Sequence, residues 1–396
     1  MTAAVQPATF RPRLATTALF LGNGTGIGLW AASIPPIKLA LGLNETQLGF
    51  ALLAFAVGAI LTMTVTGHVQ ARFGSARIAF LSSLAFALAL PLPALMPNLG
   101  TLAIAILILG GCNGAMDVAM NGHGAVVERV RGRPIMSSLH AAFSLGCLIG
   151  VATGGFILHA GFGAVATLGA ACGWALILVL AAGANLAVAS GEAPEPAVGF
   201  ALPSRAVLLV GALAFLCMFA EGAIADWAGV YLVSAAGAST AAATSGFSGF
   251  AFAMTIGRLL GDRIVHAFGA PRVVAAGAAV ATVGLGIPLI YPNVPLAFIG
   301  YALAGIGIAN IIPVLFSAGG RLTPGHPGIG VAMAATCGYA GFLVSPPLIG
   351  MLAGAIGLRI ALIVLALALF LVALAARRVL SGTAASLDTP SAQAVD

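Results

Sequence analysis

Two stretches decide the fold: residues 67–77 read GHVQARFGSAR, and residues 257–272 read GRLLGDRIVHAFGAPR. Each ends one long apolar run and begins the next, and each carries Phe-Gly followed three positions later by arginine. Gly74 in the first stretch and Gly269 in the second lie 195 positions apart. Similar loops at such a distance indicate that one half of the chain repeats the other.

Further pairs of residues keep nearly the same offset, which supports a duplication. Gly146 and Gly155 match Gly341 and Gly350 at an offset of 195. The other matches are Gly114 and Asp117 with Gly307 and Asn310 at 193, and Trp30 with Trp227 at 197. The repeat therefore predicts two similar halves.

The composition indicates a membrane protein. Hydrophobic residues make up 61% of the 396 residues, charged residues make up 7%, and the mean hydropathy is +1.12. A soluble protein needs roughly a quarter of its residues charged. The basic residues are scattered singly, so we expect no nucleic-acid partner. Lys38, the only lysine, follows Pro36-Ile37 and does not belong to a phosphate-binding loop.

Apolar runs of about 20 residues predict membrane-spanning helices. Twelve are present, near 13–37, 46–69, 77–96, 99–127, 135–158, 163–188, 205–234, 241–265, 272–291, 294–320, 328–354 and 357–376. With the N-terminus inside, 14 of the 16 basic residues lie on the cytoplasmic side, and only Lys38 and Arg359 lie outside. The positive-inside rule therefore predicts cytoplasmic termini.

We expect an all-α membrane protein of two pseudo-symmetric six-helix halves. The domain boundaries predicted are 1–188 for the N-terminal half, 189–204 for a cytoplasmic linker, 205–380 for the C-terminal half, and 381–396 for a disordered cytoplasmic tail. The polar, proline-containing segment 189–196 marks the linker.

This organisation resembles the major facilitator superfamily, whose signature loop follows the second span and recurs after the eighth. The first copy here has Ala71 where the family has an acid, while the second keeps Asp262. The resemblance implies that these loops gate the cytoplasmic side, with the second loop carrying more of the charge pairing. The gating residues it implies are Arg72, Arg77, Arg258, Asp262, Arg263 and Arg272, and we expect Asp226 to serve an outer gate.

Finer matches indicate a branch of that superfamily. Asp117, Asn121 and a polar His140 six residues before Gly146 resemble the fucose-permease-like branch. Segments 219–227 and 338–347 resemble a group of bacterial inner-membrane facilitators that includes a membrane protein of rhizopine (amino-cyclitol) gene clusters. The resemblance implies a small polar solute.

Acids in the middle of spans are candidates for function, since an ionisable group at the bilayer centre costs at least about 2.5 kcal/mol. Asn113, Asp117 and Asn121 form one polar stripe at intervals of four residues. Glu221 lies in the middle of span 7, and Asp226 points about 140° away from it. We predict that Asp117 and Glu221 carry protons. A structural hydrogen bond is the alternative for Asp117 and for Asp226.

The remaining candidates would bind solute. Trp30 and Trp227 could stack on a sugar or cyclitol, or they could belong to the interfacial aromatic belt. His140 is a solute contact or a structural group. Asn310 and Tyr339 supply polar groups to the second half of the cavity, and Asn113 and Asn121 supply them to the first.

Together these features predict a secondary transporter of a sugar- or cyclitol-like solute, working by alternating access with a proton gradient and no other cofactor or metal. The alternative is a proton-driven exporter of amphiphilic or cationic compounds, which the glycine-rich segment 146–155 in span 5 favours. Two deep acids without an obvious basic partner support proton coupling. A cavity with acids but no membrane-embedded arginine also favours the exporter. We expect no enzymatic activity and a monomer in the bacterial cytoplasmic membrane, with the solute and lipid as partners.

Overall fold

The computed structural model describes residues 6–131, 135–186, 204–323 and 327–385, and the regular structure in these ranges is all helical. The elements are α1 (Gln6–Ala40), α2 (Glu45–Phe73), α3 (Ser75–Ala89), the short 3-10 helix η1 (Leu92–Leu95), α4 (Leu99–Arg131), α5 (Met136–His159), α6 (Ala164–Gly183), α7 (Arg205–Ala236), α8 (Thr240–Phe268), α9 (Ala270–Ile290), α10 (Val294–Ile308), α11 (Ile311–Arg321), α12 (Pro327–Ile356) and α13 (Leu358–Ala385).

The structure is consistent with the predicted twelve spans. Ten spans in the described ranges are long and apolar enough to cross a membrane, and α10 and α11 together form one of them. The other two are α1 and α8, with 35 and 29 residues. Both exceed the roughly 20 residues that a bilayer requires.

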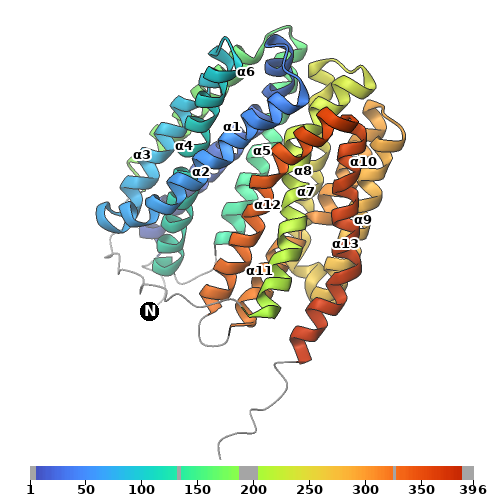
Figure 1. Cartoon of the computed structure of the whole chain (residues 1–396). Coiled ribbons are helices and arrows are strands. Elements are labelled where there is room, and N and C mark those ends of the chain that lie inside the picture. The colour runs from blue at the N-terminus through green and yellow to red at the C-terminus, as the bar shows by residue number, and fades with distance from the viewer. Residues whose placement is uncertain (1–5, 132–134, 187–203, 324–326, 386–396) are drawn as a thin grey trace, which may run out of the picture.

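The helices form two groups that lie side by side, α1–α6 and α7–α13 (Figure 1). The start of α1 and the end of α13 lie at the same end of the bundle (Figure 1). The predicted linker at 189–204 lies almost wholly in the undescribed range 187–203. Most of the predicted tail at 381–396 lies in a second undescribed range, 386–396.

The backbone repeats between the two groups as the sequence predicts. Gly110 of α4 lies against the carbonyl oxygen of Phe55 in α2, and Gly305 of α10 lies against that of Phe250 in α8. The two glycines are 195 residues apart, and so are the two phenylalanines. The glycines at 74 and 269 have φ angles of 89° and 78°, which favour glycine, and each links two consecutive helices.

Polar side chains at the helix starts explain where several spans begin. Asn44 accepts from the backbone N–H of Gln47 at 2.8 Å, while Gln47 accepts from that of Asn44 at 3.0 Å, which forms a complete capping box at α2. Ser204, Ser239 and Asn293 cap α7, α8 and α10 by each accepting one backbone N–H. These caps satisfy N–H groups that would otherwise lack partners.

The two groups meet through α2 against α12 and through α5 against α8. Thr46, in the first turn of α2, donates to the carbonyl oxygen of Gly350 at 3.2 Å, and Gly49 packs on the backbone of the same glycine. Gly155, near the end of α5, packs on Thr244, near the start of α8. All these contacts lie toward the end of the bundle away from the termini, so the halves are closed there.

The expected continuous span at 294–320 is interrupted. α10 ends at Ile308 and α11 begins at Ile311. Pro313 has no N–H to donate to the carbonyl of Ala309, and its ring crowds that carbonyl, so the helix breaks one turn before the proline. The break places the Asn310 side chain in the interior.

Candidate functional site

An ion pair between two spans lies near the middle of the C-terminal half. Glu221 is near the centre of α7, and Arg258 lies in α8, ten residues before that helix ends. Nη2 of Arg258 is 3.6 Å from Oε1 of Glu221. The expectations that Glu221 lacks a basic partner and that no arginine is embedded in the membrane are therefore wrong. They failed because α8 continues well beyond Arg258, which brings the guanidinium opposite α7.

The same guanidinium also reaches the N-terminal half. Nη1 of Arg258 donates to Oγ of Ser144 in α5 at 2.9 Å. This bond joins side chains of the two halves, whereas the closure at Thr46 and Gly350 uses a backbone carbonyl. A hydrogen bond to a charged group is stronger than one between neutral groups, so Ser144 is a functional candidate that sequence reasoning missed.

Asn310 holds the backbone beside this arginine. Its Nδ2 donates to the carbonyl oxygen of Gly257 at 3.0 Å, and its side chain also contacts Gly261 one turn further along α8. Only 9% of the Asn310 surface is exposed. The structure therefore places Asn310 against α8 rather than in an open cavity, and its predicted contact with solute stays a prediction.

Asp117 lies in the middle of α4 and is half-buried. The amide of Asn121 donates to the backbone carbonyl of Asp117 at 2.8 Å and to its carboxylate at 3.2 Å. In the described part of the chain, no basic side chain lies within ion-pair distance of this carboxylate. Asp117 therefore differs from Glu221, which has a basic partner.

Tyr339 of α12 lies within electrostatic range of the carboxylates of both Asp117 and Glu221. Its hydroxyl lies within range of the charge of Asp117 in the N-terminal half and of Glu221 in the C-terminal half. The residue is 43% exposed although its ring lies against Phe342, with 6.4 Å between ring centroids. Charged groups from both halves thus act on one side chain of α12, and the predicted solute path through them stays a prediction.

The N-terminal half adds further polar groups. Nδ2 of Asn23 in α1 donates to Oδ1 of Asn113 at 2.8 Å, which ties α1 to the stripe on α4. Asn23 was missed, although an amide in the middle of an apolar run is a signal that could have identified it. His140 is exposed, packs edge-on against Phe20 at 5.4 Å between ring centroids, and lies within electrostatic range of Arg258.

Three predicted residues lie outside this polar centre. Trp30 is 5% exposed and Trp227 is 0% exposed, and both belong to the hydrophobic core. Neither indole offers an open face to a solute in this conformation, and Nε1 of Trp227 has no hydrogen-bond partner among the described residues. Asp226 is half-buried in α7, and its assignment to an outer gate stays a prediction.

The predicted gating arginines near the helix ends are exposed; they are Arg72, Arg77, Arg263 and Arg272. The guanidinium of Arg72 lies over the ring of Phe73 at 5.4 Å. The side chain of Asp262 lies outside the described residues. Charge pairing at this face therefore stays a prediction.

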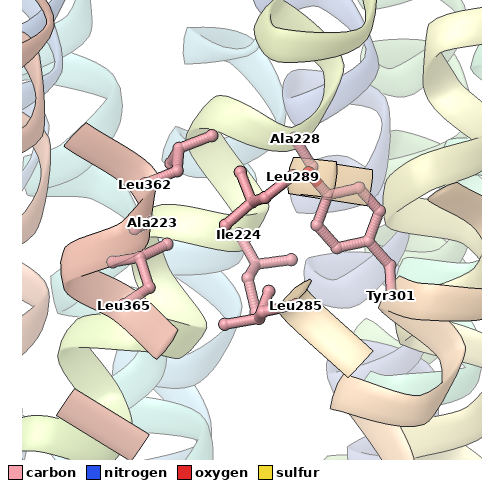
Figure 2. A pocket seen from close by; sticks show the side chains of 8 residues that line it. All are labelled: Ala223, Ile224, Ala228, Leu285, Leu289, Tyr301, Leu362 and Leu365. Carbon is pink, nitrogen blue, oxygen red and sulfur yellow. The ribbon is translucent and has the colours of Figure 1, made fainter. Parts of the chain in front are cut away.

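An apolar cavity elsewhere in the C-terminal half is too small for a solute. Seven aliphatic side chains and Tyr301 surround it, from α7, α9, α10 and α13 (Figure 2). Its volume of about 10 Å³ leaves room for one water at most. The polar centre between the halves remains the candidate site.

Two pseudo-symmetric six-helix halves around a polar centre define a membrane transporter. Residues 15–264 match the family model of the Major Facilitator Superfamily. An uncharacterised MFS-type transporter of Yersinia pestis is 37% identical over 376 residues, which are 95% of this chain and 97% of that protein. Membrane protein MosC of Rhizobium meliloti is 36% identical over 87% of this chain and 84% of its own.

Solved structures show the same fold. A bacterial homologue of the human lysosomal transporter Spinster, in an inward-facing and occupied conformation, aligns with a TM-score of 0.76 at 14% identity, over 98% of this chain and all of that one. A variant of the nucleoside transporter NupG aligns with a TM-score of 0.74 at 13% identity, over 94% and 99% of the two chains. The chain belongs to the Major Facilitator Superfamily.

Proposed function

We propose that this transporter moves a small polar solute, sugar- or cyclitol-like, across the cytoplasmic membrane by alternating access, driven by protons. The observation that carries the proposal is the convergence of Asp117, Tyr339, Glu221, Arg258 and Ser144 from both halves. Burying charged groups inside a membrane is costly, so such groups mark solute and ion pathways. A site between two repeats is what alternating access requires.

The side chains of the centre suit a hydroxylated solute. Asn113 and Tyr339 can each donate and accept hydrogen bonds, and the paired carboxylate and guanidinium of Glu221 and Arg258 place an acceptor beside donors. Of these two charged side chains, 18% and 24% respectively remain exposed. A solute with neighbouring hydroxyl groups could therefore reach both members of the pair.

The orientation follows from the basic residues. With both termini in the cytoplasm, as the positive-inside rule predicts, the contacts of Thr46, Gly49 and Gly155 close the outer face. The described conformation is then closed on the outer side, and transport requires these contacts to separate in another part of the cycle.

A second candidate function is proton-driven export of a cationic compound. Asp117 favours it, since this carboxylate has no basic partner in the described part of the chain and a cation could neutralise it. The same carboxylate would then bind either a proton or the cation.

The test is uptake into liposomes containing the purified protein, with and without an imposed pH gradient. We would use labelled myo-inositol, D-glucose and the cation tetraphenylphosphonium. Gradient-driven accumulation of a hydroxylated solute that Arg258→Gln abolishes, and that Arg378→Gln at an exposed position of α13 leaves intact, supports the proposal. Accumulation of tetraphenylphosphonium alone would favour the exporter, and uptake without any gradient dependence would contradict both.

A further inference from the structure

Two side chains hold the guanidinium of Arg258, and a third side chain holds the backbone beside it. Its backbone neighbour Gly257 accepts the amide of Asn310 at 3.0 Å. Its guanidinium donates to Ser144 at 2.9 Å and lies 3.6 Å from the carboxylate of Glu221. The positive charge of Arg258 is therefore held beside Glu221 of α7 by Ser144 of α5. Asn310, just before α11, holds the backbone next to it.

The surroundings of Asp117, in contrast, contain no basic side chain among the described residues. Asn121, on its own helix, is the hydrogen-bonding partner of its carboxylate among the described residues, and this amide is neutral. The titratable group that faces it from the C-terminal half is Tyr339 of α12. No positive charge is held beside Asp117 in the described ranges.

Several titratable or charged groups face Glu221 from the helices around it. They are Arg258 of α8, Cys217 of α7, Cys147 of α5 and Tyr339 of α12. Arg258 alone among them is a permanent cation.

Charge arithmetic separates the two carboxylates. An ionised Glu221 makes the pair with Arg258 neutral, whereas a protonated Glu221 leaves one uncompensated positive charge inside the membrane. For Asp117 the opposite holds. Its ionised form is an uncompensated negative charge, and its protonated form is neutral. An uncompensated buried charge is costly, so each carboxylate favours a different state.

We infer that the two central carboxylates have separate roles: Asp117 takes up and releases the coupled proton, and Glu221 stays ionised as the fixed counter-ion of Arg258. Ser144 is then a positioning residue, which keeps the guanidinium in place from the other half. The division of roles rests on the proposed proton-coupled transport, but the protonation of each carboxyl can be measured without it.

The experiment uses dicyclohexylcarbodiimide, an apolar reagent that adds to protonated carboxyl groups in membranes. The purified full-length protein would be labelled between about pH 5 and pH 8, and peptides carrying adducts at Asp117 and Glu221 would be quantified by mass spectrometry. We expect an adduct at Asp117 that decreases as the pH rises, and little adduct at Glu221 at any of these values. Asp117→Asn, which removes the first adduct, confirms its assignment.

Replacing the arginine gives the decisive comparison. In Arg258→Gln, labelling of Glu221 should rise roughly tenfold or more, because an opposite charge within about 6 Å shifts a carboxyl's protonation by at least that factor. Arg258→Lys, which keeps the charge, and Arg263→Gln, an exposed position on the same helix, should leave Glu221 unlabelled. Ser144→Ala should give an intermediate rise.

Glu221 labelled as fast as Asp117 in the parent protein would overturn the inference, as would Glu221 labelled alone. If Arg258→Gln does not fold, the ratio of the two adducts in the parent and in Arg258→Lys still decides. The labelling needs no transported solute, so its outcome is independent of the uptake assay. Absent uptake would contradict the proposed function, whereas equal labelling would contradict only the division of roles.

Discussion

Replacing Gly49 by alanine should favour the conformation in which the end of the bundle away from the termini is open. A Cβ at this position would lie 2.8 Å from the carbonyl oxygen of Pro346 and 2.9 Å from Cα of Gly350, where ordinary contacts are 3.4–4 Å. Both neighbours are backbone atoms of α12, so no side chain can rotate away. The clash exists only while α2 and α12 are in contact at this end.

The size of the shift follows from the overlap. The shortest contact is too close by 3.4 − 2.8 = 0.6 Å. Inserting a methyl group into a well-packed contact costs about 1–3 kcal/mol. That cost applies to one conformation only, and it would change the ratio of the two conformations by roughly 5- to 150-fold.

The assay is the distance between two spin labels on opposite halves, measured by double electron–electron resonance in a background without the five native cysteines. Phe162 follows α5 and Tyr291 follows α9, and both are exposed, at 61% and 62%. Labels at these positions should report longer distances in Gly49→Ala than in the parent.

Two further glycines provide matched controls. Gly67 lies in the same helix with nothing within 4 Å of an added Cβ, so Gly67→Ala should leave the distances unchanged. Gly110 packs on the Phe55 carbonyl within one half, so Gly110→Ala should lower thermal stability without changing the distances. If folded Gly49→Ala gives the same distances as Gly67→Ala, the close backbone contact does not control the closure.

The other predictions concern the polar centre and the core. Asp117→Asn, which removes the predicted proton carrier but keeps its shape, should abolish accumulation under a pH gradient while solute counterflow continues, and equal accumulation in both proteins would refute that role. Trp227→Ala should lower the free energy of unfolding by about 3–5 kcal/mol, seen as a lower Tm in detergent, because the indole is fully buried; an unchanged Tm would mean that the core tolerates the cavity. Asn310→Ala should cost about 0.5–1.5 kcal/mol, since the Gly257 carbonyl loses the side-chain amide that donates to it, and an unchanged Tm would contradict this.

Much of the fold could be predicted because lipid imposes a simple rule on sequence. Every span needs a run of apolar residues, and duplicated loops such as those around Gly74 and Gly269 keep their spacing. The stripe through Asp117 was also visible, since a carboxylate stands out in an apolar helix.

The contacts within the site were harder to predict, for physical reasons. The positive-inside rule assigns an arginine to a membrane face without showing whether its helix continues, so Arg258 was placed with the gating loop. α7 is apolar on nearly all sides, and its sequence therefore carries no period that would show Trp227 pointing into the core. The bond from Asn310 to Gly257 depends on how two distant helices pack. Pro313, in contrast, was a visible signal for the break that turns Asn310 inward.

The interrupted span has a consequence for how the C-terminal half can move. α10 packs on α8 and α9, whereas α11 packs mainly on α12 and α7. A continuous helix would force these four neighbours to turn together as one rigid body. With the backbone divided at Ala309 and Asn310, each segment can follow its own neighbours, so tilting of α12 at the termini-bearing end need not be transmitted to the outer portions of α8 and α9. The C-terminal half therefore contains two linked groups of helices that can tilt separately, rather than one rigid body.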